Sequence, residues 1–112
     1  MAVQETYTCE RDNLFSAGCQ IAEIESDSLL IPEGKQYKRG TLLTAEGAMC
    51  GDGGTVYAVL AEDIDTTEGA KEAPVYLSGE YNQAYLIAEG EVASLKTSAR
   101  MAGIYFKESI PA

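Results

Sequence analysis

Residues 56–81, VYAVLAEDIDTTEGAKEAPVYLSGEY, constrain the fold more than any other part of the chain. In the runs VYAVL and PVYL, alternate side chains fall on the same side of an extended backbone, and both sides carry apolar groups. An acidic stretch with Thr and Gly, residues 65–72, separates the two runs. The pattern therefore predicts a β-ribbon of two strands that are covered on both faces.

Length and charge limit the classes of function that the chain can serve. With 112 residues, 46% of them apolar, it has length for one small domain, which gains stability by burying a face against a partner subunit. Its net charge is −10, from 18 acidic and 8 basic residues. DNA binding depends on Lys and Arg side chains that contact phosphates. The only cluster of basic residues in the sequence is Lys35, Lys38 and Arg39, and we expect it on a solvated strand edge. We therefore predict no nucleic-acid partner.

The sequence lacks the residue pattern of a zinc site. It has no His, and its cysteines, Cys9, Cys19 and Cys50, show no CxxC spacing, so no metal or other cofactor is predicted. The N-terminus lacks the pattern of a signal peptide, and no stretch reaches the roughly 18 apolar residues that cross a bilayer. We expect synthesis in the cytoplasm, no membrane partner, and free thiols, with a Cys9–Cys19 bridge as the alternative.

Local signals divide the chain in two. Residues 1–24 lack a sustained period and are predicted to form a flexible N-terminal arm, whereas residues 25–112 form a β-rich domain. Residues 92–102 carry apolar side chains at the helical period, and Gly103 offers an end to that helix. Further strands and turns are expected at residues 28–31, 32–34, 36–44 and 104–106. The predicted fold class is mainly β with one short C-terminal helix.

Two loop motifs have both a functional and a structural interpretation. Glu62, Asp63 and Asp65 are the right residue types for Ca²⁺ or Mg²⁺, or for an acid/base pair. Hard-cation loops need more oxygen ligands at fixed spacing than this run offers, so we favour a solvated loop. The GDGG run at 51–54 lacks the Lys and Ser/Thr of a phosphate loop and is interpreted as a hairpin turn.

Aromatic residues and potential nucleophiles also favour a non-catalytic protein. Tyrosines on strands are more often half-buried packing residues than parts of a ligand-stacking surface. We therefore predict a packing role for four tyrosines, Tyr76, Tyr81, Tyr85 and Tyr105. Without His, a Ser or Cys nucleophile would need a Lys or carboxylate partner, and none lies in a Gly-x-Ser-x-Gly setting. We predict that the protein is not an enzyme; a carboxylate-pair hydrolase stays open, because folding can bring two acids together without a sequence signature.

Five segments, taken in order, resemble the lambda-type head decoration proteins of tailed bacteriophages. They are Glu5-Thr-Tyr-Thr, Gly40-Thr-Leu-Leu, Ala58-Val-Leu-Ala-Glu-Asp, Val75-Tyr-Leu-Ser-Gly-Glu-Tyr and Ala102-Gly-Ile-Tyr-Phe. The resemblance covers residues 39–110 and the first eight residues, whereas 9–34 match poorly. It implies a β-clip, a bent two-stranded ribbon whose ends form an incomplete barrel. It also implies a homotrimer that binds the major capsid protein on the outer surface of the virion and stabilises the expanded head.

The same resemblance implies that the N-terminal arm contacts the capsid. Its side chains favour strands but cannot make a core alone, so they suit pairing with a partner's strand. The predicted capsid-binding residues are Val3, Gln4, Glu5, Thr6, Tyr7 and Thr8. The alternative function is a small ligand-binding β-clip module of the SAF type, which also has an Arg-Gly-Thr-like run. Such a module usually belongs to a larger enzyme, whereas this chain starts with its own Met and ends soon after its last strand.

Overall fold

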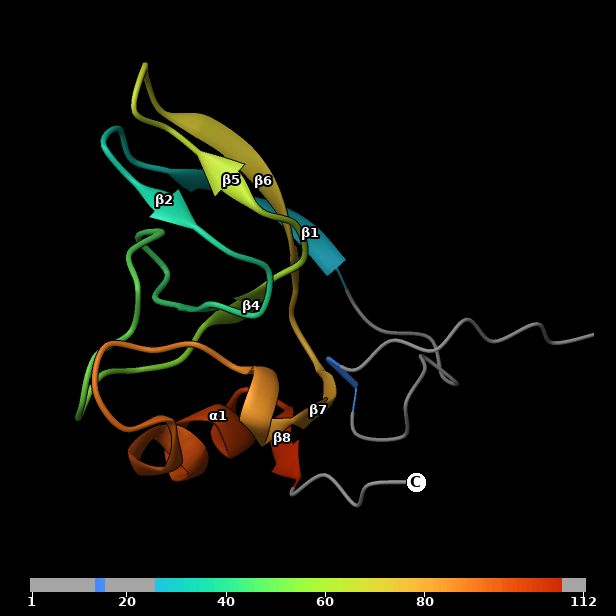
Figure 1. The fold of residues 1–112 in the computed structure, drawn as a ribbon. Helices are drawn as coiled ribbons and strands as arrows, with labels where there is room; N and C mark the ends of the chain where they lie inside the picture. Colours follow the sequence, from blue (N-terminus) through green and yellow to red (C-terminus); the bar gives the residue numbers. More distant parts are fainter. Residues whose placement is uncertain (1–13, 16–25, 108–112) are drawn as a thin grey trace, which may run out of the picture.

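The computed structural model describes residues 14–15 and 26–107 (Figure 1). This part of the chain is mainly β, 42% strand and 15% helical. In chain order the elements are β1 (Ser26–Ile31), β2 (Gln36–Tyr37), β3 (Leu42–Leu43), β4 (Ala58–Leu60), β5 (Ile64–Asp65), β6 (Lys71–Tyr76), β7 (Gly79–Asn82), the 3-10 helices η1 (Gln83–Tyr85) and η2 (Val92–Leu95), α1 (Lys96–Met101) and β8 (Ile104–Lys107). The described strands form no closed barrel, and the predicted fold class, mainly β with one short helix near the C-terminus, is confirmed.

The strands assemble into three sheets. β1 and β6 form an antiparallel ribbon, and β4 and β3 extend it to the order β1-β6-β4-β3. β2 and β5 pair antiparallel, whereas β7 and β8 pair in parallel. Figure 1 shows β2 and β5 beside the β1–β6 ribbon, with β7, β8 and α1 at the opposite end of the molecule. We call these the ribbon end and the helix end.

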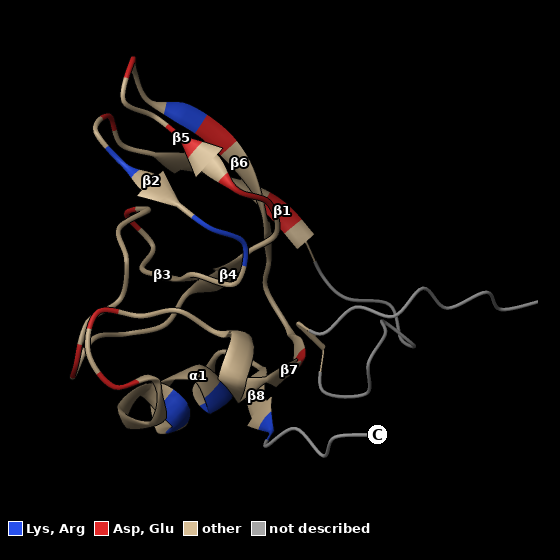
Figure 2. Cartoon of the chain, viewed as in Figure 1, with Lys and Arg blue, Asp and Glu red and all other residues tan. Residues whose placement is uncertain are grey.

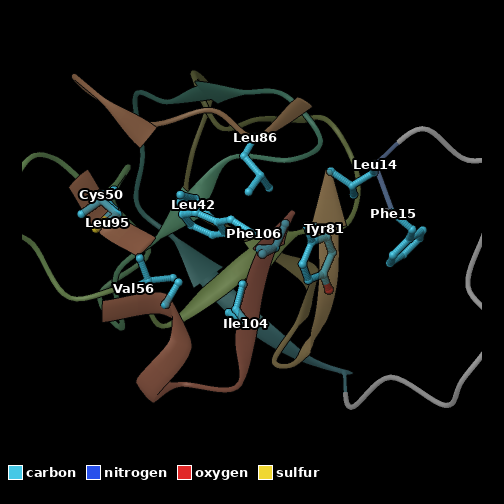
Figure 3. Packing of buried hydrophobic residues seen from close by; sticks show 12 residues of the cluster. Leu14, Phe15, Leu42, Cys50, Val56, Tyr81, Leu86, Leu95, Ile104 and Phe106 are labelled. Atoms are coloured by element: carbon cyan, nitrogen blue, oxygen red, sulfur yellow. The ribbon is translucent and has the colours of Figure 1, made fainter. Parts of the chain in front are cut away.

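The core consists of two hydrophobic clusters on opposite sides of β4. Ala58 and Leu60 belong to the ribbon-end cluster, whereas Val59 belongs to the helix-end cluster. All three are buried, so the expectation that this strand is covered on both faces is confirmed. Because side chains alternate along a strand, a shift of the β4 pairing register by one residue would turn Ala58 and Leu60 toward the helix-end cluster and Val59 toward the ribbon-end cluster. The helix-end cluster (Figure 3) contains Leu14, Phe15, Leu42, Cys50, Val56, Val59, Tyr81, Leu86, Leu95, Ala99, Ile104 and Phe106.

The second strand of the predicted ribbon, β6, is fully covered on one face and only partly covered on the other. Ala73 and Val75 are buried, whereas Glu72 and Pro74 on the other face are exposed. Its partner β1 also leaves Leu30 exposed. The expectation of two-sided cover therefore holds for β6 only at Tyr76, which lies on the Pro74 face and packs against the helix-end cluster.

The predicted C-terminal helix is present, and its first turn is a 3-10 turn. η2 leads directly into α1, and the buried side chains Leu95 and Ala99 pack in the helix-end cluster. Gly103 ends the helix in the left-handed conformation, with φ of 88°, and its N–H donates to the carbonyl of Arg100 at 3.1 Å. This is the usual role of glycine at a helix C-terminus.

Leu14 and Phe15 lie inside the segment 1–24 that we predicted to be an arm, yet both are buried in the helix-end cluster. The backbone N–H of Asn82 donates to the carbonyl of Leu14 at 2.8 Å, and Phe15 forms an antiparallel bridge with Tyr81. This pair is thus part of the core. The remainder of the predicted arm lies outside the described residues, and its boundary stays a prediction.

Candidate interaction surfaces

The predicted capsid-binding residues, 3–8, lie outside the described residues, as do Cys9 and Cys19. The surfaces that the structure places belong to residues 14–15 and 26–107. They are built from charged turns at both ends of the molecule and from a few exposed apolar side chains.

Two of the acidic residues at 62–65, Asp63 and Asp65, stabilise turns. Asp63 Oδ1 accepts the backbone N–H of Arg39 at 2.7 Å. Asp65 Oδ1 accepts the N–H of Thr67 at 3.0 Å and its hydroxyl at 2.8 Å. These two hydrogen bonds, the backbone bond foremost, hold the pKa of the Asp65 carboxyl below its usual value. Among the residues that the structure describes, no three His, Cys, Asp or Glu side chains are placed to hold a metal ion.

The loop that follows β5 is anchored by a residue that sequence reasoning missed. Thr66 is buried, and its hydroxyl donates to the carbonyl of Pro32 at 2.6 Å and accepts the N–H of Lys35 at 2.9 Å. Its carbonyl accepts the N–H of Gly34 at 2.8 Å. These bonds join the β1–β2 turn to the β5–β6 loop and fix it at Thr66, whereas Glu62, Asp63 and Asp65 are exposed, as expected of a solvated loop. A Thr inside an acidic loop carries no sequence signal for this role.

The three basic residues of the cluster at 35–39 do not form one surface. Lys38 is exposed, whereas Lys35 and Arg39 are partly buried. The Nε–H of Arg39 donates to the carbonyl of Ala61 at 2.9 Å, and its guanidinium lies 5.9 Å from the centre of the Phe15 ring. Arg39 therefore holds the β2–β3 turn against the core, and the expectation of a solvated strand edge holds for Lys38 alone.

The four tyrosines are divided between the core and the surface. Tyr81 is fully buried, and its hydroxyl donates to the carbonyl of Ser78 at 2.6 Å. Burial raises the pKa of Tyr81, with a further contribution from Tyr76, so the phenol stays neutral. Tyr76 is partly buried beside it, with Phe15 completing an aromatic group whose ring centres lie 5.3–6.2 Å apart. Because Tyr85 and Tyr105 are exposed, the four do not form a single stacking surface.

Cys50, the cysteine that the structure describes, lies in the hydrophobic core. Cys50 is fully buried in the helix-end cluster and is free, and burial raises the pKa of its thiol. A buried thiol with a raised pKa is a poor nucleophile, because the thiolate is the reactive form. Cys50 therefore packs as a small apolar side chain.

The GDGG run forms a turn, in which the N–H of Gly54 donates to the carbonyl of Gly51 at 2.9 Å. It lies within the long connection between β3 and β4, which pair antiparallel, so the run is one turn inside a long hairpin loop and not a tight hairpin turn of its own. Asp52 in this turn accepts the N–H of Glu91 and the hydroxyl of Ser94, both at 3.0 Å. The turn thereby fixes the start of η2, a long-range contact that the local sequence does not reveal.

Apolar surface is available for partners at both ends of the molecule. The exposed large apolar side chains are Leu30, Tyr57, Tyr85, Met101 and Tyr105. Leu30 lies on β1, which is one of the two edge strands of the four-stranded sheet, and Tyr105 lies on β8 of the parallel pair. Edge strands present backbone groups that can pair with another chain. Figure 2 marks the charged positions along the chain, and many of the acidic ones lie in loops.

No known family model matches the sequence, and the search of curated proteins found no match either. No helix in the described part of the chain is long and apolar enough to cross a membrane.

Proposed function

We propose that the protein is a capsid decoration protein that binds the outer surface of a tailed-phage head as a trimer and stabilises the expanded shell. One observation carries the proposal. Four of the five segments with the family resemblance lie in the described residues, and they coincide with elements that build the core: the Gly40 turn with β3, then β4, the end of β6 with β7, and finally β8. Together these form a bent, mainly β fold without a closed barrel, as expected of a β-clip.

The mechanism that fits such a protein is mechanical. Its partner is the major capsid protein, and its place is the outside of the virion. A trimer that contacts several capsid subunits favours the assembled shell by mass action, because any ligand that binds only one state stabilises that state. A net charge of −10 keeps such a protein soluble until it binds. Neither catalysis nor a cofactor is needed for this role.

The alternative, a ligand-binding β-clip module of the SAF type, has less support. The buried polar side chains are used by the fold itself: Thr41 donates to the carbonyl of Lys38 at 2.6 Å, and Asn82 accepts the N–H of Ala84 at 3.2 Å. Within the described residues, every buried side-chain nitrogen and oxygen has a hydrogen-bond partner. These groups are therefore engaged in the core and are not directed at a ligand.

Two measurements test the proposal: the mass of the protein in solution and its attachment to capsid shells. Native mass spectrometry of the purified protein should give three times the 12.0 kDa monomer mass. The protein should also sediment with expanded shells of the cognate capsid protein and raise the temperature at which they rupture. A monomer at micromolar concentration that stays in the supernatant would contradict the proposal and favour the ligand-binding module.

A further inference from the structure

The exposed side of α1 differs in charge from the rest of the molecule. Residues 92–107 contain three basic residues and no Asp or Glu, in a chain with 18 acidic and 8 basic residues. Lys96 and Arg100 are four residues apart, as are Thr97 and Met101, so the four lie on neighbouring positions of one helix face. All four are exposed, and 87% of the Met101 surface is accessible. We call these four residues the α1 face.

A second surface of the helix end has the opposite charge. Asp52, Glu89 and Glu91 are exposed and belong to two loops that the fold holds together. Gly51 forms a bridge with Glu89, and Asp52 accepts the N–H of Glu91 at 3.0 Å. We call the three carboxylates the acidic edge. Figure 2 shows the acidic loops on one side of the helix end and the basic positions of α1 on another.

Three other described basic residues, Lys38, Arg39 and Lys71, lie near acidic ones. Lys71 is followed by Glu72 in β6, and the backbone of Arg39 is hydrogen bonded to Asp63. Lys38 directly precedes Arg39 in the chain. On the α1 face, by contrast, two cations lie within a segment that has no Asp or Glu, and the apolar side chain of Met101 lies beside them.

We infer that the α1 face of one copy docks on the acidic edge of a second copy. The inference rests on the proposed trimer and names its interface. Copies with a charge of −10 repel each other unless surfaces of opposite sign meet, and this chain carries both surfaces. When each copy turns its α1 face to one neighbour and its acidic edge to another, the contact is heterologous, and heterologous contacts close into rings when the rotation allows. Met101 supplies an apolar contact between the charges.

Charge reversal and charge exchange test the interface. The double variant Lys96→Glu/Arg100→Glu should raise the dissociation constant of the trimer by roughly tenfold or more, because attractive pairs become repulsive. Adding Glu89→Lys/Glu91→Lys to the same chain should restore most of the affinity. Asp52 is left unchanged because it holds the Glu91 N–H, and the side chain of Glu91 makes no capping hydrogen bond of its own.

The matched control is Lys38→Glu/Lys71→Glu, which makes the same change in net charge at exposed positions of the ribbon end. It should leave association unchanged. Mass is measured by sedimentation equilibrium over a concentration series, with thermal unfolding as a check of folding. A wild-type monomer would overturn both the proposed function and this interface. A wild-type trimer that tolerates the α1 reversal, or that the exchange fails to restore, would overturn the interface alone.

Discussion

At the scale of single residues, the fold depends on glycines whose backbone no other residue adopts easily. Gly40 has φ of 96°, and a Cβ at this position would lie 2.6 Å from the carbonyl oxygen of Tyr85. Gly34 has a similar φ of 89° but open space around it. We predict that Gly34→Ala costs about 1 kcal/mol from conformational strain, whereas Gly40→Ala costs roughly 3 kcal/mol because the backbone clash adds to it. Urea denaturation of both variants measures the difference, and equal losses would contradict the close approach.

A second residue-scale prediction concerns protonation of Asp65. Its folded pKa lies below the usual 3.8 because Thr67 donates two hydrogen bonds to the carboxylate. The stabilisation is therefore present above the unfolded pKa and is lost as pH falls through the folded value. NMR titration should show Asp65 titrating below 3.8 and moving part of the way back in Thr67→Ala, which keeps the backbone bond. An unchanged pKa in that variant would remove the hydroxyl as a cause.

At the scale of elements, the docking of the Leu14–Phe15 pair is open to a direct test. The Phe15 ring packs against Tyr76 and Tyr81 and is almost fully buried. Phe15→Ala should lower the free energy of unfolding by roughly 3–5 kcal/mol, the usual range for a buried aromatic side chain. Tyr85→Ala, which removes an exposed aromatic ring, is the control and should cost far less. Similar small losses in both variants would show that Phe15 is not anchored in the core.

The same scale shows which elements a sequence can predict. β4, α1 and β8 follow from local periodicity, because each buries one or two regular faces: Ala58 and Leu60 against Val59, and Leu95 with Ala99. The parallel pairing of β7 with β8 and the pairing of β2 with β5 join segments far apart in the chain, and no local period encodes such contacts.

In the surface loops, too, local sequence features were predictable, whereas contacts between distant segments were not. The acidic stretch was visible in the sequence, but the Asp52 contacts with residues 91 and 94 and the Thr66 contacts with residues 32–35 were not. They arise when loops distant in sequence meet, so only the folded chain reveals them. The predicted arm residues are known from the sequence alone, and their role stays a prediction.

At the scale of the whole molecule, the proposed attachment depends on having three arms. The side chains of residues 3–8 favour strands, so an arm suits addition to an exposed strand of the capsid protein. Ordering a segment costs about 1–2 kcal/mol per residue in backbone entropy, so one arm alone binds weakly. In a trimer, once one arm has docked, the others bind at high effective concentration, and the affinity rises by roughly 10² or more.

Deleting residues 2–8 should therefore leave the β-rich domain and its trimer intact while sharply weakening attachment to shells. The deletion does not touch Leu14 or Phe15, so the core contacts that they make are kept. Cosedimentation of truncated and full-length protein with expanded shells measures attachment, and sedimentation equilibrium of the truncated protein checks the trimer. If the truncated trimer sediments with shells as well as the full-length protein does, the arm is not the anchor. The capsid contact would then lie on the folded domain, where the edge of β1 and its exposed Leu30 would be the first surface to mutate.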